Sequence, residues 1–526
     1  MRGFVFTNYT AWDGMKINEK YYCIKKAALP LITIISLSVL LLSLIPFLIT
    51  ALYSYPFADD FGYGIGPHLA WQDTGSLIRV MSMVWANVAG FYVNWQGSFA
   101  AIFLMSLNPA IFNESLYGIT TVLLLGMLVI SVFYFVQTIF KTFIKANHYI
   151  GIYFATVVLF FMIQYMPSVS EGLFWFNSGI YYTFFFCLSL FYYALMIRLL
   201  DAETNKEKYV PRLKLYGAWA VLLVLSILIA GGNLVTGLIT SCISIFICMV
   251  RIILRKQRIL PLVIVNIVLL SFFMINCLAP GNAYRALYHE SPGVLTSFLV
   301  SFRYCIYYII KWSNWRIALT LLLLQPLFYF AMKPITIRFR LPLLYVAAGF
   351  CLLSAQFYPI AYSGSWLPER MANIIYFTYI FWVFSSCLYM TGWLGRITQE
   401  GKLNRWLTRF QCFGNKKIKM RVAIVGCAAS LFLICAWGSV IRGNRSHTSY
   451  IVVDLWNGIP QTYAAENSIR FALYREPSLE VWVEPYTAHP HALYFGDITD
   501  DSQHWVNIQV ARFFKKNSVR LTYKSN

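Results

Sequence analysis

The stretch ALPLITIISLSVLLLSLIPFLITAL, residues 28–52, has no charged residue and is followed at once by YSYPFADDFGYG, residues 53–64. An α-helix rises about 1.5 Å per residue, so about 20 apolar residues cross the hydrocarbon core of a bilayer. Residues 28–52 are long enough to do so. They are also too long for a signal peptide, and no small-residue cleavage site follows them. This segment predicts a transmembrane helix near the start of the chain.

The composition of the whole chain indicates a membrane protein. Of its 526 residues, 59% are hydrophobic and only 12% are charged, against about 45–50% and about 25% in soluble domains. Too little polar surface remains to cover a soluble globule. We therefore predict an all-α polytopic membrane protein with about eleven transmembrane helices, at residues 28–52, 116–137, 149–166, 180–198, 215–231, 233–253, 259–279, 313–332, 341–361, 371–394 and 421–441.

The distribution of lysine and arginine predicts the orientation, because basic residues remain on the cytoplasmic side of a membrane. Every second connection is rich in basic residues, and the connections between them hold few. The N-terminus is therefore expected in the cytoplasm and the C-terminus outside the cell membrane. The formal net charge of +21 thus reports topology and does not indicate nucleic-acid binding.

Two segments are apolar but are not expected to cross the membrane. Residues 293–311 carry Arg303 in the middle, and counting them as a span would invert every later connection. We interpret them as a helix lying at the outer interface, with Arg303 reaching the headgroups. Residues 68–112 are expected to form two short amphipathic helices on the same face.

The predicted division of the chain follows from these spans. Residues 1–27 form a cytoplasmic segment, and 28–441 form the membrane domain with a first outer loop at 53–115. Residues 442–526 have mixed charge, a helical pattern around 456–474 and the alternating segment LEVWVEP at 479–485. They predict a small extracytoplasmic α/β domain. The eleven cysteines show no CxxC or Cys/His spacing, so neither disulfides nor a zinc site are indicated.

Acidic residues are few, and several lie next to membrane spans. Asp59 and Asp60 follow the first span, and Glu171 is the lone acid of an aromatic outer loop that includes Trp175. Charged groups near membrane depth are costly, so they tend to be functional or paired. A solvated Asp-Asp turn and an interfacial aromatic belt are the competing interpretations.

Two further outer connections carry arginine. APGNAYRA (279–286) presents Asn282 and Arg285, and SGSWLPERMAN (363–373) presents Trp366, Glu369 and Arg370. A salt bridge or a headgroup anchor would equally explain each arginine. All these loops are expected on one face, so they could converge on one cavity with carboxylates, arginines and aromatic walls, to which Trp95 also contributes.

Such a cavity suits transfer of a sugar from a lipid phosphate. An aspartate would deprotonate the acceptor hydroxyl while arginine neutralises the departing phosphate. Planar guanidinium groups bind phosphate at two points, and aromatic faces pack against sugar rings.

These residues resemble known membrane glycosyltransferases. ADD (58–60) after the first span is similar to the acidic motif of the GT-C superfamily, whose members use polyprenyl-phosphate sugars. EGLFWFNSGIYY, APGNAYR and YFGDITDDSQHWVNIQVARFF resemble an uncharacterised bacterial polytopic family akin to the serotype-converting glucosyltransferases that modify O-antigen. The resemblance covers residues 28–520.

The resemblance implies an inverting glycosyltransferase of the bacterial inner (plasma) membrane. Its partners would be a polyprenyl-phosphate-linked sugar donor, a glycan acceptor of the cell envelope and membrane lipid, with no nucleic acid. Asp59 or Asp60 would be the base, with Asp59 favoured, and Glu171 would assist the acceptor or a divalent cation such as Mg²⁺ or Mn²⁺. The chain lacks a second acidic pair in its second outer loop, which leaves metal dependence open.

Two other functions remain open at this stage. An O-antigen or capsule polymerase also has many spans and arginine-rich outer loops, but would not need the early Asp-Asp pair. A lipid or oligosaccharide transporter would be expected to carry charged or broken helices at the midplane and inverted repeats, and the sequence shows no convincing repeat.

Overall fold

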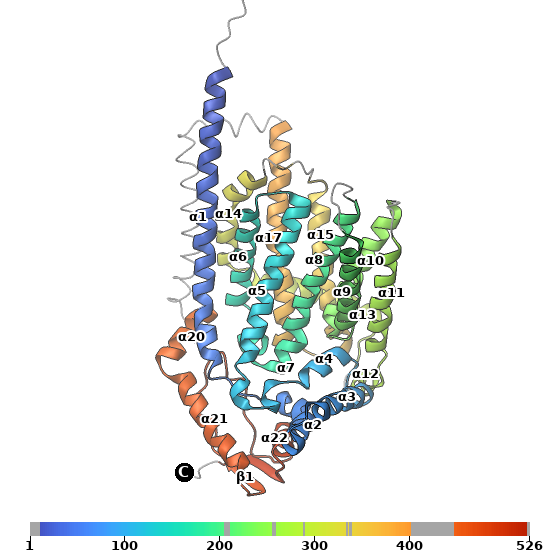
Figure 1. Cartoon of the computed structure of the whole chain (residues 1–526), viewed down its shortest axis with the longest axis vertical. Coiled ribbons are helices and arrows are strands. Elements are labelled where there is room, and N and C mark those ends of the chain that lie inside the picture. The colour runs from blue at the N-terminus through green and yellow to red at the C-terminus, as the bar shows by residue number, and fades with distance from the viewer. Residues whose placement is uncertain are drawn as a thin grey trace, which may run out of the picture.

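The computed structural model of the chain describes residues 11–204, 211–254, 259–287, 290–332, 335, 339–400 and 446–522. Most of these residues are helical, and the long helices lie side by side in one bundle (Figure 1). Shorter helices and two strands gather at one end of the bundle, the lower end in Figure 1, and we call them the cap layer. The chain is a mostly helical, multi-pass membrane protein.

Nine helices in the described part of the chain are long and apolar enough to cross a membrane. Two further apolar helical stretches, His148–Gln164 in α6 and Trp315–Gln325 in α14, are shorter. The predicted span at 421–441 lies outside the described residues, so the count of eleven stays a prediction. The bundle helices are α1 (Ala11–Ala51), α5 (Ile119–Ile139), α6 (His148–Gln164), α8 (Phe185–Thr204), α9 (Arg212–Ala230), α10 (Leu234–Ile253), α11 (Leu260–Cys277), α13 (Val294–Trp312), α14 (Trp315–Met332), α15 (Pro342–Gln356) and α17 (Glu369–Glu400).

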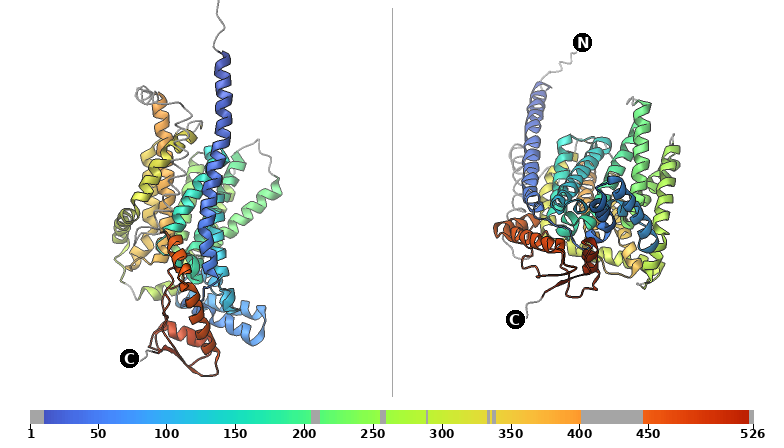
Figure 2. Two further views of the ribbon diagram at one scale, coloured as in Figure 1. Left: turned by 90° about the vertical axis from the view of Figure 1, so that its left-hand side faces the viewer. Right: turned by 60° about the horizontal axis from the view of Figure 1, so that its bottom comes forward.

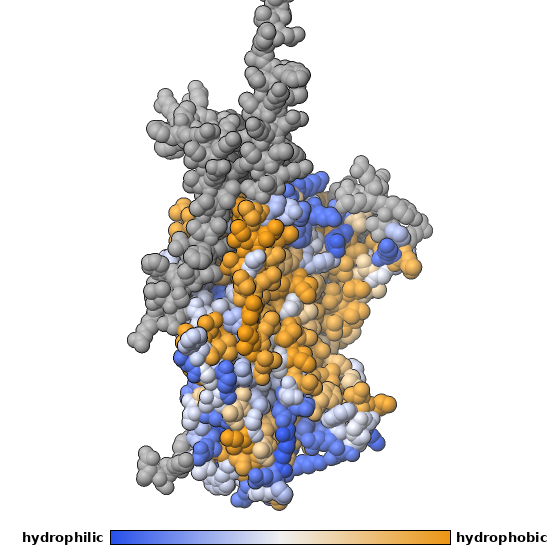
Figure 3. Space-filling model, turned by 60° about the vertical axis from the view of Figure 1, so that its left-hand side comes forward, coloured by the Kyte–Doolittle hydropathy of each residue, from blue (hydrophilic) through white to orange (hydrophobic). Residues whose placement is uncertain are grey.

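The surface of the bundle is apolar where lipid would contact it. Figure 3 shows a broad hydrophobic band above a cap layer that is largely hydrophilic. Large apolar side chains such as Leu42, Ile253 and Leu343 are more than half exposed. Exposed apolar surface of this extent indicates contact with another apolar phase, here the bilayer.

Helix α6 lies in the interior of the bundle. Its sequence is apolar on every side, and nearly every residue from Ile150 to Gln164 is buried. It contacts α1, α5 and α17. A helix that is hydrophobic all round is expected at the centre of a bundle rather than at its surface.

Helix α13 corresponds to the segment expected at the interface. Its length and composition place it among the nine candidate spans. The Ser297 hydroxyl near its start is 3.4 Å from the Ala361 carbonyl of α16 (Tyr358–Ser363), and Ser313 after its end bonds Tyr379, about three turns into α17. The two ends of α13 thus contact α16 and α17, and the interfacial placement of this segment stays a prediction.

The cap layer contains more helix than expected for residues 68–112. Helix α2 begins at Asp59, so the aspartate pair lies in the first turn of a helix rather than in a loop. The elements before the C-terminal segment are α2 (Asp59–Thr74), α3 (Leu77–Asn94), α4 (Phe99–Met105), η1 (Pro109–Ile111), η2 (Glu114–Leu116), η4 (Ser170–Phe174), α7 (Phe176–Gly179), η5 (Ile180–Phe184), α12 (Pro280–Ala286) and α16 (Tyr358–Ser363).

The C-terminal segment completes the cap layer. It contains α20 (His447–Trp456), α21 (Ile459–Arg475), β1 (Glu480–Val483), α22 (Trp505–Phe513) and β2 (Ser518–Leu521). The two strands pair in parallel, with Glu480 opposite Ser518 and Val483 opposite Leu521. The predicted helix and strand in this region are therefore confirmed.

One apolar cluster joins the C-terminal segment to the first loop. Phe61 of α2 packs with Phe471 of α21 and with Phe513 of α22, and both views in Figure 2 place these elements together. Gly62 and Gly64 permit this contact, because a Cβ at Gly62 would lie 2.7 Å from Gln509 and one at Gly64 would lie 3.1 Å from Phe513. The C-terminal segment thus shares its core with α2.

Candidate active site

The two adjacent aspartates have different surroundings. Asp60 is fully buried, and its carboxylate accepts hydrogen bonds from the Tyr117 hydroxyl at 2.5 Å, from Phe57 N at 3.0 Å and from Asn177 N at 3.1 Å. Burial raises the pKa of Asp60 from 3.8 to about 7, against the opposing effect of these three donors. With both carboxylate oxygens engaged, Asp60 holds α2 against the start of α5 and against α7.

Asp59 points to a different environment and is half-buried. No described residue donates a hydrogen bond to its carboxylate or forms an ion pair with it. Burial raises the pKa of Asp59 above the ordinary 3.8, while Arg370 and then Arg285 lower it. Of the two acids, Asp59 is the one whose oxygens remain available to a ligand.

Arg285 and Arg370 reach the same region from distant parts of the chain. Arg285, at the end of α12, lies 5.0 Å from the centre of the Trp95 ring and donates to Gln96 Oε1 at 3.3 Å. Arg370, in the first turn of α17, lies 5.3 Å from the centre of the Trp175 ring. Neither guanidinium is within 4.0 Å of an acidic side chain in the described part of the chain. Each guanidinium group thus lies on an aromatic ring and forms no ion pair with a described acidic side chain.

Glu171 supports Arg370 from the other side. Its carboxylate accepts a hydrogen bond from the backbone N of Arg370 at 2.8 Å. Burial raises the pKa of Glu171, and the positive charge of Arg370 opposes this. Neighbouring Trp175 is 5% exposed and donates through Nε1 to the Phe57 carbonyl at 3.2 Å. The second loop therefore positions both Arg370 and the segment that leads into Asp59.

Several polar aromatic residues line this region that the sequence did not single out. The Tyr63 hydroxyl accepts from Gln96 Nε2 at 3.2 Å, and the Tyr181 hydroxyl bonds Ser98 at 2.9 Å. Tyr182 interacts with the guanidinium of Arg370. Tyr63 lies one helical turn after Asp59 on α2, a relation that appears only once α2 is known to begin at Asp59.

The remaining predicted pocket residues divide into two groups. Asn282 is structural: its side chain accepts from Gly97 N and donates to the carbonyls of Asn276 and Cys277. Trp95 lies under Arg285 and belongs to the site. Trp366 is 78% exposed and Glu369 is also exposed, so the structure leaves both at the edge.

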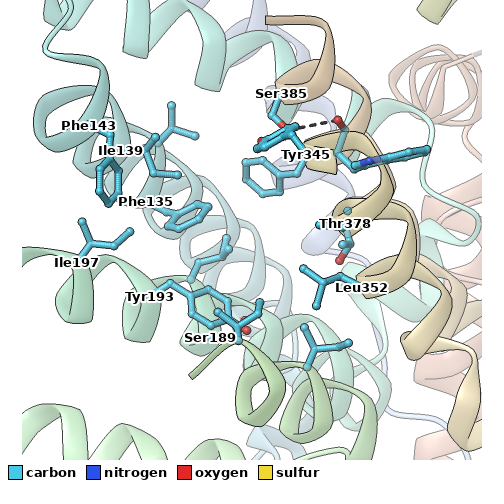
Figure 4. Close-up of a pocket in the computed structure, with 18 of the residues that line it drawn as sticks. Phe135, Ile139, Phe143, Ser189, Tyr193, Ile197, Tyr345, Leu352, Thr378 and Ser385 are labelled. Atoms are coloured by element: carbon cyan, nitrogen blue, oxygen red, sulfur yellow. Dashed lines mark hydrogen bonds between the residues drawn. The ribbon is translucent and has the colours of Figure 1, made fainter. Parts of the chain in front are cut away.

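An apolar groove begins one helical turn after Arg370 along α17, at Ile374. It has a volume of about 910 Å³ and lies between α5, α8, α10, α15 and α17 (Figure 4). Ile374 of α17 lines it near the site, and Phe143 lines it at the far end of the bundle. Thr378 and Ser385 face into it together with Tyr193 and Leu352 (Figure 4). The groove can hold a long apolar chain beside the charged site.

The donor set does not fit a protein-held divalent cation. Among the described residues, no three His, Cys, Asp or Glu side chains are grouped so as to bind one metal ion. Glu171 is committed to the backbone of Arg370, and two arginines adjoin Asp59. Mg²⁺ favours carboxylate oxygens, and neighbouring guanidinium groups oppose it.

Comparisons with protein families, curated proteins and solved structures find no match to this chain.

Proposed function

We propose that this protein is a membrane glycosyltransferase that moves a sugar from a polyprenyl-phosphate donor to a cell-envelope glycan or a lipid-linked acceptor, with inversion at the anomeric carbon. One observation carries the proposal. Among the described residues, none donates a hydrogen bond to Asp59, and no acidic side chain lies within 4.0 Å of the guanidinium groups of Arg285 and Arg370 beside it. Unpaired charges in a buried setting are costly, and a phosphate with a hydroxyl-bearing acceptor would satisfy all three.

The proposed reaction uses these groups in one step. The Asp59 carboxylate takes the proton of the acceptor hydroxyl, and the acceptor oxygen bonds to the anomeric carbon of the donor sugar. The bond between that carbon and the phosphate oxygen breaks, and its electron pair stays on the phosphate. Arg285 and Arg370 neutralise the charge that develops there. Attack opposite the leaving phosphate inverts the anomeric configuration, and the products are a glycoside and polyprenyl phosphate.

The apolar groove supports a lipid-borne donor over a soluble nucleotide sugar. Its lining is almost wholly apolar and continues along α17 from the turn after Arg370. A polyprenyl chain in the groove would place its phosphate at the arginines. A nucleotide sugar would leave the groove without an occupant.

The membrane arrangement belongs to the same proposal. Eleven spans, with 293–311 at the interface and 421–441 as the last span, would place the cap layer outside the cell membrane and the N-terminus in the cytoplasm. A polyprenyl-phosphate sugar presented on that side would reach Asp59. Residues 442–526 would then form the extracytoplasmic part.

The decisive experiment measures release of free polyprenyl phosphate by the purified full chain. The donors would be polyprenyl-phosphate glucose, galactose, mannose and N-acetylglucosamine, each with envelope glycan as acceptor. Asp59→Asn should lower the rate by at least about 100-fold, the usual contribution of a general base. Its melting temperature should stay near that of the wild type, because no hydrogen bond is lost.

Asp73→Asn on the same helix is the matched control. Asp73 is exposed and, among the described residues, forms its ion pair with Lys515, so this variant should keep wild-type turnover. Full activity in Asp59→Asn, or no release from any donor by the wild type, would refute the proposal.

A further inference from the structure

A second cavity lies on the opposite side of α2 from the Asp59 site. It has a volume of about 280 Å³ and is enclosed by α2, the η1–η2 turn, α21 and α22. This volume corresponds to roughly nine water molecules at about 30 Å³ each, which is enough for a sugar ring. Its polar lining residues are His68, Gln72, Asn113, Glu114 and Arg475, and phenylalanines form the rest of the wall.

His68 contributes a polar group that the fold leaves unused. It is 6% exposed, and its Nδ1 lies 2.8 Å from the Ile111 carbonyl. A carbonyl oxygen only accepts, so Nδ1 carries the proton and Nε2 is an acceptor. Nε2 is buried and has no hydrogen-bond partner among the described residues. Burial lowers the pKa of His68, in keeping with a neutral ring. A buried acceptor without a donor is costly unless a ligand supplies one.

The rim of the cavity offers donors and acceptors in a fixed arrangement. Arg475 Nη2 lies 2.5 Å from Glu114 Oε2, and the pair joins α21 to the η2 turn. Gln72 and Asn113 are exposed amides at the opening. Phe513 stacks on the His68 ring at 3.8 Å, and Phe112 and Phe514 line the wall. Aromatic faces with mixed amide, carboxylate and guanidinium groups match the C–H faces and hydroxyls of a neutral sugar.

We propose that this cavity is a saccharide-binding subsite that holds a sugar unit of the glycan acceptor away from the reacting end. The inference rests on the proposed function, because it assigns the acceptor to this side of α2. His68 is nine residues after Asp59 on one helix, which is roughly 13 Å along the axis. An oligosaccharide can bridge that distance. A subsite here would select acceptors by chain length and by the sugar at that position.

The test measures glycan binding without any donor. The probe is an array of two- to six-unit oligosaccharides built from glucose, galactose, mannose, rhamnose and N-acetylglucosamine, presented to the full chain in nanodiscs. The best binder is then titrated in solution. Gln72→Ala should weaken its binding about three- to tenfold, as expected for one lost hydrogen bond. Gln72→Trp should block the opening and weaken binding more than tenfold. Asp73→Ala, one residue away and outside the cavity lining, should bind like the wild type.

The outcomes separate this inference from the proposed transfer. Asp59→Asn should bind the glycan normally even where turnover is lost. If the wild type retains no oligosaccharide, or if Gln72→Trp binds as tightly as Asp73→Ala, the subsite is refuted whatever the transfer assay shows. If binding follows the expected pattern but no donor is consumed, the cavity remains a saccharide site and only the transferase proposal fails.

Discussion

Removal of the Tyr117 hydroxyl should destabilise the cap layer without removing the chemistry. This hydroxyl donates to Asp60 at 2.5 Å and accepts from Phe176 N at 2.9 Å, and the residue is 1% exposed. Tyr117→Phe keeps the ring, so no large void forms. It removes one hydrogen bond to a carboxylate, worth about 1.5–3 kcal/mol, and leaves a buried N–H unpaired at about 1–3 kcal/mol. The expected loss is therefore roughly 2.5–6 kcal/mol in the free energy of unfolding.

The assay is thermal unfolding of the purified protein in detergent, followed by tryptophan fluorescence. Tyr117→Phe should lower the melting temperature by several degrees, whereas Tyr307→Phe, whose ring is 58% exposed, should not. Below the transition, turnover of Tyr117→Phe should fall by less than about tenfold, against at least about 100-fold for Asp59→Asn. The Asp60→Asn and Tyr117→Phe effects should be less than additive, because both break the same contact. Unchanged melting of Tyr117→Phe, or full additivity with Asp60→Asn, would refute a structural role for Asp60.

Four further outcomes are expected. Arg370→Lys and Arg285→Lys should each lower the maximal rate about tenfold or more, because an ammonium lacks the planar two-point geometry of a guanidinium. The control Arg303→Lys, at an exposed position, should have no effect. Equal activity in all three variants would show that Arg285 and Arg370 do not belong to the site. Burial raises the pKa of Asp59 above 3.8, and a general base must be deprotonated to act. Turnover should therefore fall when the pH is lowered to the raised pKa of Asp59. A rate that stays constant down to pH 3.8 would contradict this. Ala348→Trp in the groove wall should raise the KM for a long-chain donor but not for a donor with a shortened prenyl chain, and equal KM changes would argue against the groove. A cysteine at exposed Ser478 should react with an impermeant thiol reagent in intact cells and one at Lys141 only after lysis; the reverse pattern would invert the proposed topology.

The bundle could be predicted from sequence because its signal is local. Apolar runs and alternating basic connections mark the ends of the membrane helices. Loops at the helix ends on one side of the membrane lie on the same face of the bundle. That logic anticipated the approach of Asp59, Glu171, Arg285 and Arg370. Helix α2 was harder to predict from the sequence, because Gly62, Gly64 and Pro67 have low helix propensity. The glycines are explained by close packing against α22, which is visible only in the tertiary structure.

The different roles of Asp59 and Asp60 also depend on distant residues. The donors to Asp60 include Tyr117 and Asn177, which are far from it in the chain. Nothing in the local sequence distinguishes the two acids. Likewise, Tyr63, Tyr181 and Tyr182 are three of 36 tyrosines, so residue type alone carries no signal for them. Trp366 is the opposite case: the sequence predicted it as a pocket residue because it lies four residues before Arg370, but its side chain is largely exposed.

The joint core of α2 and the C-terminal segment has a consequence for biosynthesis. About 430 residues are translated between the end of α2 and the start of α22, which takes roughly 20–90 s at the usual elongation rates. During that interval Phe61 lacks its partners, and the Trp175 ring under Arg370 lacks the Phe495 ring that stacks on it at 4.5 Å. Residues translated after the proposed charged groups therefore complete the packing around them. A shorter chain that ends before Phe471 would carry every proposed reacting group and would lack the aromatic contacts that pack against Phe61 and Trp175.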